Sequence, residues 1–111
     1  MAQPAARTQA VFRALADPTR REILAMLAAG PRPIGDIAAE FDMTRPAIAK
    51  HLAILRDGDL IRVAAKGRER INRLNAAALK SAADWLHYFD QFWDEKLANL
   101  KSAVEQKRGR R

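Results

Sequence analysis

The stretch at residues 44–56 constrains the fold more than any other part of the chain. Thr44 is a favourable N-cap residue, and Pro46 is tolerated just after it because the first turn of a helix leaves its N–H groups unpaired. Three apolar residues then recur at spacings of four and three: Ile48, Leu52 and Leu55. This spacing predicts a helix that is fixed to the core by one face.

The opposite face of this predicted helix carries small residues where a surface helix usually has long polar ones. It consists mainly of Pro46, Ala47, Lys50 and Ala53. Small side chains let a helix enter the major groove of DNA, where an alanine methyl can touch a thymine methyl and Arg45 or Lys50 could reach guanine edges or phosphates. From this helix alone, an ordinary amphipathic helix with a bare outer face is an equally good interpretation.

Three short helices are predicted before this one, at about residues 8–16, 18–29 and 34–41. Asp17 followed by Pro18 can cap and start the second helix, and the Gly-Pro pair at Gly30 ends it. Residues 41–43 then form a tight connection to the Thr44 helix. The third and fourth helices are therefore predicted to form a helix-turn-helix.

Two β-strands are predicted next, at 60–64 and 70–74, joined by a tip at 65–69. Ile61, Val63, Ile71 and Leu74 are predicted to point inward, with Arg62, Arg70 and Arg73 on or near the other face. Lys66, Arg68 and Arg70 surround a flexible Gly67, as suits a wing that contacts a phosphate backbone or a minor groove. A solvated hairpin is the alternative, but its place directly after a basic helix favours phosphate contact.

The basic charge of the chain is concentrated on this helix and hairpin. Residues 44–73 carry eight Lys or Arg and three Asp or Glu, and residues 107–111 add four positive charges to a total of +7. Such a local excess indicates a polyanion. Nucleic acid is favoured over an anionic membrane, because no basic amphipathic helix with a large apolar face adjoins it.

A helical segment at about residues 76–106 carries the longest apolar seam in the chain. Asn75 can cap it, and a break near residues 87–90 could divide it into two helices. Both tryptophans, the single tyrosine and two of the four phenylalanines lie within residues 85–93. This is more aromatic surface than a terminal helix needs for its own core.

We predict that this seam and the first helix form a homodimer interface. The predicted interface residues are Phe12, Leu15, Leu86, Phe89, Trp93, Leu97 and Leu100. The alternative is that the seam folds back onto its own domain, and one face could serve each purpose. The aromatic cluster could also form a pocket for an unidentified small-molecule effector, although aromatics at helical spacing more often serve packing.

At 111 residues the chain is long enough for one domain and too short for two. We expect a frayed N-terminus at residues 1–7, a winged-helix DNA-binding and dimerisation domain at 8–106, and a disordered basic tail at 107–111. The absence of cysteine excludes disulfides and thiolate sites. No signal core and no apolar run near the ~20 residues that span a bilayer are found, so we expect a cytoplasmic protein with no membrane partner.

The order of these elements and two motifs resemble the ArsR family of winged-helix transcriptional regulators. The motifs are Leu15-Ala16-Asp17-Pro18-Thr19-Arg20-Arg21-Glu22-Ile23-Leu24 and Lys50-His51-Leu52-Ala53-Ile54-Leu55-Arg56-Asp57-Gly58-Asp59-Leu60-Ile61. The resemblance implies a mainly α-helical fold with a small β-hairpin, and a homodimeric repressor with one recognition helix in each major groove of a pseudo-palindromic operator. The predicted DNA-contact residues are Thr44, Arg45, Pro46, Ala47, Lys50, His51, Lys66, Arg68 and Arg70.

The chain also departs from that family. Many relatives sense metals through a Cys-x-Cys before the recognition helix, where residues 33–37 here contain no thiol. Others bind zinc between terminal helices, and four residues could mimic part of such a set: Asp84, His87, Asp90 and Asp94. The seam has only one histidine, so we predict no metal and no cofactor, and His87 is interpreted as a packed residue or part of an ion pair. His51 either binds a phosphate or holds its helix in place.

Enzyme activity is not expected, because no nucleophile, base and orienting group come together and no phosphate-binding glycine loop occurs. Two other functions compete with sequence-specific regulation. The winged helix could be a protein-interaction module that binds a different protein through its aromatic seam. The chain could instead bind DNA or RNA non-specifically, although single strands need exposed aromatics, which the basic region lacks.

Overall fold

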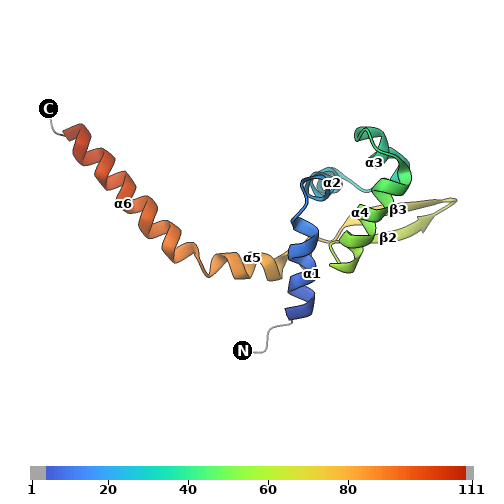
Figure 1. The fold of residues 1–111 in the computed structure, drawn as a ribbon, viewed down its shortest axis with the longest axis horizontal. Coiled ribbons are helices and arrows are strands. Elements are labelled where there is room, and N and C mark those ends of the chain that lie inside the picture. The colour runs from blue at the N-terminus through green and yellow to red at the C-terminus, as the bar shows by residue number, and fades with distance from the viewer. Residues whose placement is uncertain (1–4, 110–111) are drawn as a thin grey trace.

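The structure, a computed structural model, describes residues 5–109. The helices of this part of the chain are α1 (Ala5–Leu15), α2 (Pro18–Ala29), α3 (Ile34–Glu40), α4 (Arg45–Asp57), the 3-10 helix η1 (Ala76–Leu79), α5 (Lys80–His87) and α6 (Asp90–Gly109). The strands are β1 (Arg32–Pro33), β2 (Ile61–Lys66) and β3 (Glu69–Leu74). Helices α1 to α4 and the sheet form one body, from which α5 and α6 lead away (Figure 1).

The first two helices meet at the Asp17-Pro18 pair, as the sequence predicts. The Asp17 side chain accepts a hydrogen bond from the backbone N–H of Arg20 at 3.1 Å, and Pro18 begins α2. Helix α1 begins at Ala5, so the expected frayed end is wrong for residues 5–7, where alanine favours the helix. Residues 1–4 lie outside the described part of the chain.

Helices α3 and α4 form the predicted helix-turn-helix. Thr44 caps α4, because its hydroxyl oxygen accepts from the backbone N–H of Ala47 at 3.3 Å. The three stripe residues of α4 are buried: Ile48, Leu52 and Leu55. Both the start of α4 and the face that it buries are therefore confirmed.

The sheet has three antiparallel strands in the order β1-β3-β2, one more strand than predicted. Strand β1 pairs with β3, and the Asn72 side-chain amide donates to the Arg32 carbonyl oxygen at 3.3 Å. Asn72 is the one buried polar residue of the described chain. A strand of two residues is too short to produce an alternating pattern, so sequence analysis missed it.

The register of the wing corrects the predicted facing of two residues. Val63 is paired with Asn72 and Ala65 with Arg70, so Arg70 lies on the face that β2 turns toward α4. Ile71 is paired with Ala64 on the opposite face, although it was predicted to point inward. The reason is the tight turn at residues 67–68, where Gly67 has a φ of 62° and fixes a longer hairpin than predicted.

The hydrophobic core lies between α1, α2, α3, α4, the start of β2 and α5. Its buried residues are Val11, Ala14, Ile23, Leu24, Leu27, Ile37, Ile48, Leu52, Leu55, Leu60, Ile61 and Ala82. Helix α1 crosses the end of α4 so closely that a Cβ on Gly58 would lie 3.1 Å from the Ala10 carbonyl oxygen. Helix α6 contributes no residue to this core.

The C-terminal segment is divided as the sequence allowed, with α5 ending at His87 and α6 beginning at Asp90. Asn75 does not cap it with its side chain, which donates instead to the Asp59 carbonyl oxygen at 2.8 Å. Residues 107–109 belong to α6, so the expected disorder of the tail is wrong there, where lysine and arginine favour the helix. Residues 110–111 lie outside the described range.

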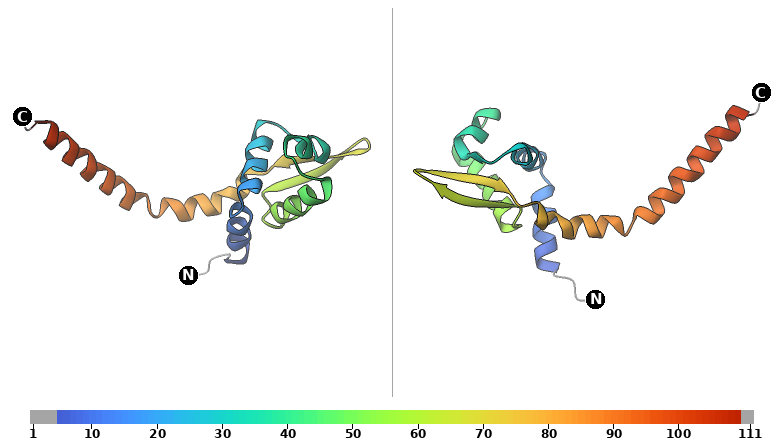
Figure 2. Two further views of the ribbon diagram at one scale, coloured as in Figure 1. Left: turned by 45° about the horizontal axis from the view of Figure 1, so that its top comes forward. Right: turned by 180° about the vertical axis from the view of Figure 1, so that it is seen from behind.

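Helix α6 makes the molecule much longer than a compact chain. The radius of gyration is 19.4 Å, whereas a compact chain of this length has about 13 Å. The wing and α6 project from opposite sides of the body in every view (Figure 2). No helix among the described residues is both long and apolar enough to cross a membrane.

Candidate nucleic-acid interface

The outer face of α4 is exposed and carries small residues and a cation. Thr44, Arg45, Pro46 and Lys50 from the predicted DNA-contact set are exposed, and Ala47 is half-buried. The Thr44 hydroxyl already accepts one hydrogen bond as the helix cap, but Thr44 is exposed and its oxygen can accept a second one. The face therefore combines a flat surface with free positive charge, as helix insertion into a major groove requires.

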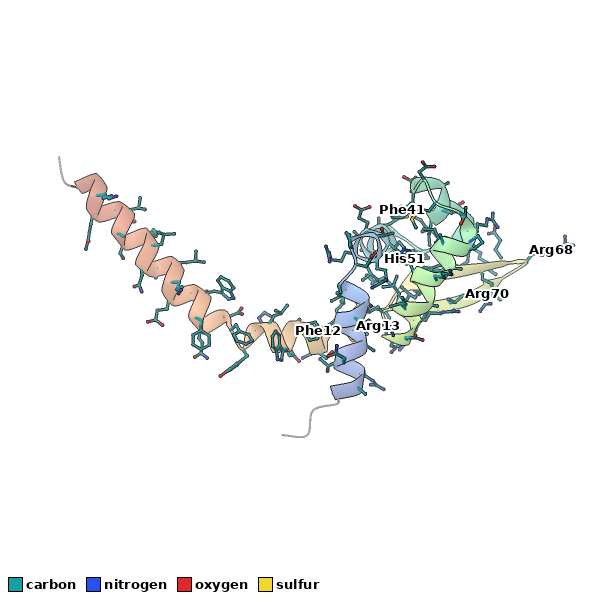
Figure 3. All side chains as sticks on the ribbon, viewed as in Figure 1. Phe12, Arg13, Phe41, His51, Arg68 and Arg70 are labelled. Carbon is teal, nitrogen blue, oxygen red and sulfur yellow. The ribbon has the colours of Figure 1, made fainter. Side chains whose placement is uncertain are left out.

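The wing extends the positive charge beyond α4. Lys66, Arg68 and Arg70 are all exposed, and Arg68 lies at the far tip of the hairpin with Arg70 nearer the body (Figure 3). The two-residue turn keeps the two strands paired up to Lys66 and Glu69. The tip is therefore a stiff projection that holds its cations at a defined distance from α4.

A cleft joins the wing to the start of α4. It has a volume of about 300 Å³ and is lined by Pro33, Ile34, Gly35, Asp36, Arg45, Arg68, Glu69 and Arg70. None of its three arginines makes an ion pair within 4.0 Å among the described residues. The three guanidinium groups outnumber the two carboxylates of the lining, Asp36 and Glu69, so the cleft carries a net positive charge that suits an anion.

Gly35 is the residue that lets Arg45 lie in this cleft. A Cβ at position 35 would be 2.6 Å from Arg45 Nη2 and 3.2 Å from its Cζ, so any larger residue would displace the guanidinium. The sequence analysis missed this contact because Gly35 is separated from Arg45 by a helix and a turn. The Arg45 side chain is thus turned toward the wing and away from the outer face of α4.

His51 lies on the flank of α4 against α2 (Figure 3). Its Nδ1 is 3.4 Å from Arg20 Nη1 and 3.8 Å from Asp17 Oδ2, and its side chain is 20% exposed. Of the two roles considered from the sequence, this geometry fits the one in which His51 holds the helix in place. Arg20 was not singled out, because the sequence carries no signal that joins it to residue 51.

Asp17 is held in its charged form by the same contacts. The hydrogen bond from the Arg20 backbone N–H lowers the pKa of the Asp17 carboxyl below its ordinary value of 3.8, and the nearby Arg20 and His51 side chains act in the same direction. Partial burial opposes this shift. The carboxylate therefore remains an acceptor at the start of α2 at neutral pH.

A second exposed surface lies at the other end of the molecule, on α5 and α6. We call it the apolar arm, and its exposed large hydrophobic residues are Trp85, Leu86, Tyr88, Phe89, Phe92, Trp93, Leu97, Leu100 and Val104. Trp85 meets Phe12 of α1 edge to face, with 5.5 Å between ring centroids. Of the residues predicted for the dimer interface, Phe12 and Leu15 are half-buried and the other five are exposed.

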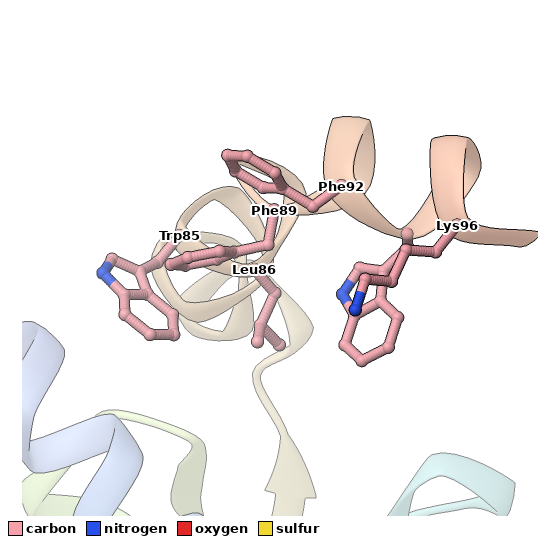
Figure 4. A pocket seen from close by; sticks show the side chains of 6 residues that line it. Trp85, Leu86, Phe89, Phe92 and Lys96 are labelled. Carbon is pink, nitrogen blue, oxygen red and sulfur yellow. The ribbon is translucent and has the colours of Figure 1, made fainter.

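The apolar arm contains a groove where α5 gives way to α6 (Figure 4). Its volume is about 610 Å³, and it is lined by Trp85, Leu86, Phe89, Phe92, Trp93 and Lys96. Trp85 and Phe89 pack on each other with centroids 4.9 Å apart. The groove is almost wholly apolar, with the Lys96 ammonium as its one charged group.

His87 takes part in an ion pair at the bend between α5 and α6. Its Nδ1 is 2.6 Å from Asp90 Oδ2, and this contact raises the pKa of His87 above its ordinary value of 6.5. Asp84 is paired with Lys80 at 3.1 Å. Within the described chain, no three His, Cys, Asp or Glu side chains are grouped so that they could hold a metal ion.

Comparison with known proteins identifies the family. A helix-turn-helix domain family matches residues 15–64. The transcriptional repressor SdpR of Bacillus subtilis (strain 168) is 38% identical over 87 residues, which cover 78% of this chain and 97% of that protein. A solved ArsR-like transcriptional regulator from Rhodococcus sp. RHA1 is 36% identical with a TM-score of 0.70, over 88% of this chain and 92% of that one.

The chain belongs to the ArsR family. It is a winged helix-turn-helix transcriptional regulator with a DNA-binding domain, which confirms the predicted fold class and family. The HTH-type transcriptional regulator Rv2034 of Mycobacterium tuberculosis is a further relative, 32% identical over 94 residues that cover 85% of each chain. These relatives are named as regulators and not as enzymes.

Within this ArsR-family fold, α4 is the recognition helix and the hairpin of β2 and β3 is the wing. The matched domain ends at residue 64 and so includes α2, α3 and α4 but not the tip of the wing or the apolar arm. The match with SdpR covers nearly the whole length of SdpR. The matched domain thus covers the central part of the body, and α1 before Leu15 and strand β3 lie outside it.

Proposed function

We propose that this ArsR-family chain is a repressor that binds a pseudo-palindromic operator as a homodimer. The observation that carries the proposal is the division of the surface. The exposed basic groups of α4 and the wing lie at one end, and all the exposed large hydrophobic residues of the described chain lie on α5, on α6 or at the bend between them. A dimer formed through the arm would leave both recognition helices free to face DNA.

In this proposal, α4 reads bases with its outer face. Pro46 and Ala47 lie at its start, where a recognition helix meets base edges, and Lys50 follows one turn later. The exposed Lys50 ammonium can reach a guanine edge. His51 is not assigned a DNA contact here, because its ring is directed toward Asp17 and Arg20.

The cleft between α4 and the wing is proposed to hold the phosphate backbone. Arg45, Arg68 and Arg70 surround it, and a phosphodiester oxygen accepts from guanidinium groups in a bidentate way. Lys66 and Arg68 at the tip of the wing reach the next phosphates or the minor groove. These contacts supply affinity and register and carry no base preference of their own.

The proposed dimer covers the apolar arm. Trp93, Leu97, Leu100 and Val104 recur at spacings of four, three and four, and each is between 46% and 63% exposed. A helix of 20 residues that packs on nothing is marginal in water, so burial against a second copy would stabilise α6. Acidic residues lie near the start of α6 and basic ones near its end, which favours an antiparallel pair of these helices.

A repressor acts by occupying its operator, so no catalytic activity is part of the proposal. The cytoplasmic location that the sequence predicts is part of the same proposal, because a repressor must be in the compartment that contains its operator. SdpR is named a transcriptional repressor, which supports repression over activation for this chain. Repression would be relieved by a small molecule in the groove of the arm or by a fall in the amount of the protein.

Selection of duplexes from a random library by the purified full chain tests this function. The enriched duplex and a shuffled one are then compared by fluorescence anisotropy at ~150 mM salt, a concentration near the physiological one. We expect inverted half-sites one or more helical turns apart, at ~34–36 Å per turn, and a preference of about 10³-fold or more. Equal binding to both duplexes would contradict the proposal and indicate non-specific binding.

A further inference from the structure

Arg20 joins three helices at one point. Its Nε donates to the Ala14 carbonyl oxygen and its Nη2 to the Arg13 carbonyl oxygen, both at 2.9 Å, at the end of α1. Its Nη1 lies 3.4 Å from His51 Nδ1 on α4. One planar side chain on α2 thus binds two carbonyl oxygens at the end of α1 and reaches the flank of the recognition helix.

We propose that Arg20 is a positioning residue for DNA binding, which sets the angle of α4 through His51. The inference rests on the proposed function, because it concerns the same recognition helix. Arg20 is fixed by two hydrogen bonds to α1, so its third nitrogen is an anchored donor. An anchor on the flank of α4 restricts rotation of the helix about its own axis, and such a rotation would move Lys50 relative to the bases.

The contact requires one tautomer of His51. Arginine can only donate, so Nδ1 must be the acceptor and the imidazole proton must be on Nε2. Protonation of His51 would place an N–H in front of the guanidinium and end this hydrogen bond. Asp17 Oδ2, 3.8 Å away, would then be the partner of the ring.

The charged groups that face His51 come from α2 alone among the contacts of the described chain. They are Arg20 and Asp17, whereas α1 presents only backbone carbonyls to the Arg20 side chain. The lowered pKa of Asp17 keeps its carboxylate ionised over the range where a histidine titrates. His51 therefore has two alternative partners, and its charge selects between them.

The contacts of Arg20 also link α4, through α1, to the apolar arm. Helix α1 carries Phe12, whose ring packs on Trp85 of α5, and its end is held by Arg20. A change in how α5 packs on α1 would therefore reach α4 through the Arg20 contact, in addition to the direct packing of α1 on the end of α4 at Gly58. The chain offers no hydrogen bond from the arm directly to α4 among its described residues.

The chain also provides a matched control in Arg21. Its Nη1 donates to the Leu15 carbonyl oxygen at 2.7 Å, so it too supports the end of α1, but among the described residues its side chain makes no hydrogen bond or ion pair with α4. Arg20→Lys and Arg21→Lys each weaken the support of α1 and keep the charge. Only Arg20→Lys also removes the fixed donor to His51.

The test measures operator affinity of the full chain by anisotropy, on the duplex selected above and on a shuffled one. We expect Arg20→Lys and His51→Leu each to weaken operator binding by roughly 2- to 30-fold, and the double variant to lose little more than either alone. Arg21→Lys and His51→Gln, whose amide oxygen can still accept, should bind like the wild type. His51→Leu leaves the support of α1 intact, so the test does not depend on folding of Arg20→Lys.

A pH profile separates positioning from a purely structural role. It is measured in a His87→Gln background, so that His51 is the one remaining histidine. Gain of a cation beside DNA would ordinarily strengthen binding, whereas loss of the Arg20 contact on protonation of the ring predicts that operator affinity falls between about pH 7.5 and about pH 5.5. The His51→Gln variant should lose this pH dependence.

Three results would overturn the inference: equal losses for Arg20→Lys and Arg21→Lys, wild-type affinity for His51→Leu, or affinity that rises as the pH falls. Failure of the proposed function would look different, since the wild-type chain would then select no sequence. Wild-type selectivity with unaffected variants would contradict only the role of Arg20.

Discussion

The body and the apolar arm differ in where their hydrophobic residues lie. The body buries its apolar stripes against one another, and all but one of the core residues belong to α1 to α4 and β2 or to the residue just before it. The arm supplies only Ala82 to that core and exposes nine large hydrophobic side chains. A helix with an apolar stripe needs a partner, and the body finds one within the chain whereas α6 does not.

The placement of the basic groups is thus a property of the single chain, whereas burial of the apolar arm requires a partner. The charge of the DNA-binding end comes from exposed arginines and lysines that need no second copy for their placement. The arm offers apolar area without an intrachain partner, and in the proposed dimer its stability would depend on the protein concentration. Substitutions at the two ends should accordingly affect different measurements.

The largest effect is expected from a charge in the seam of the arm. Trp93→Glu should give monomers in sedimentation velocity, because burial of an unpaired carboxylate between two helices is strongly unfavourable. Operator affinity should fall by about 10²-fold or more, because the two half-sites are no longer bound together. The circular dichroism of the body should remain helical.

Ser102→Glu is the matched control, since it adds the same charge to the exposed side of α6 away from the seam. It should leave both the mass and the affinity unchanged. If Trp93→Glu remained a dimer, the proposal that the seam of the arm forms the dimer interface would be contradicted.

A pair of leucine truncations compares the two ends directly. Leu55→Ala in the fully buried stripe of α4 should lower the free energy of unfolding by about 2–5 kcal/mol, because it removes buried methyl groups and leaves a cavity. Leu97→Ala, 60% exposed, should change the stability of the monomer by no more than about 0.5 kcal/mol. Urea unfolding at concentrations where the chain is monomeric checks both values. Similar losses would show that α6 packs on its own body.

The cleft beside the wing separates phosphate contact from base reading. Arg45→Ala should weaken binding to all duplexes alike and lower the slope of log affinity against log salt by about one, whereas Lys50→Ala should relax base preference. Gly35→Ala should act like a milder Arg45→Ala, because its methyl group displaces the guanidinium. Anisotropy over a salt series on specific and shuffled duplexes measures both effects.

Gly30→Ala is the control for Gly35→Ala, since a Cβ at position 30 meets no atom within 4 Å. A loss of base preference in Arg45→Ala would mean that this arginine leaves the cleft on binding and reads a base, which is one of the two roles that the sequence allows for it.

The smallest effect is expected at the bend of the arm. The Asp90 carboxylate raises the pKa of His87, so the ion pair stabilises the folded bend below pH 6.5, the ordinary histidine value, and this contribution is lost as the pH rises through the higher folded pKa. Both groups are exposed, and the effect should be small. NMR titration of the His87 ring, compared with Asp90→Asn, measures it; a pKa unchanged by that substitution would contradict the assignment.

Much of the fold is predictable from the sequence because its signals are local. Thr44 and Asp17 cap helices by binding N–H groups three residues away, and Ile48 and Leu52 share a face because the helix repeats every 3.6 residues. The helix-turn-helix, the two strands of the wing and the division of the C-terminal segment all follow from such signals. The residues proposed to contact DNA on α4 and the wing were predicted from the same kind of local signal, and most of them are exposed in the structure.

The candidate site was less predictable where it depends on contacts between distant residues. His51 meets Arg20 across 31 positions, and Asn72 meets Arg32 across 40. The size of residue 35 is restricted only because the Arg45 side chain lies against it. The face of the sheet on which Arg70 lies depends on the hairpin turn, which is shorter than the tip predicted from the sequence. No periodicity within the chain carries such information.

Most of the helices and strands, the two helix caps, the buried face of α4 and the concentration of charge can be derived from the sequence, because they depend on neighbours within a few residues. The tertiary structure alone decided that β1 joins the sheet, that Arg20 ties α1 to α4, and that α6 leaves the body with its apolar stripe uncovered. The physical reason is that packing of the shared core sets the distance between segments remote in sequence, and hydrogen bonds form only where that distance allows them.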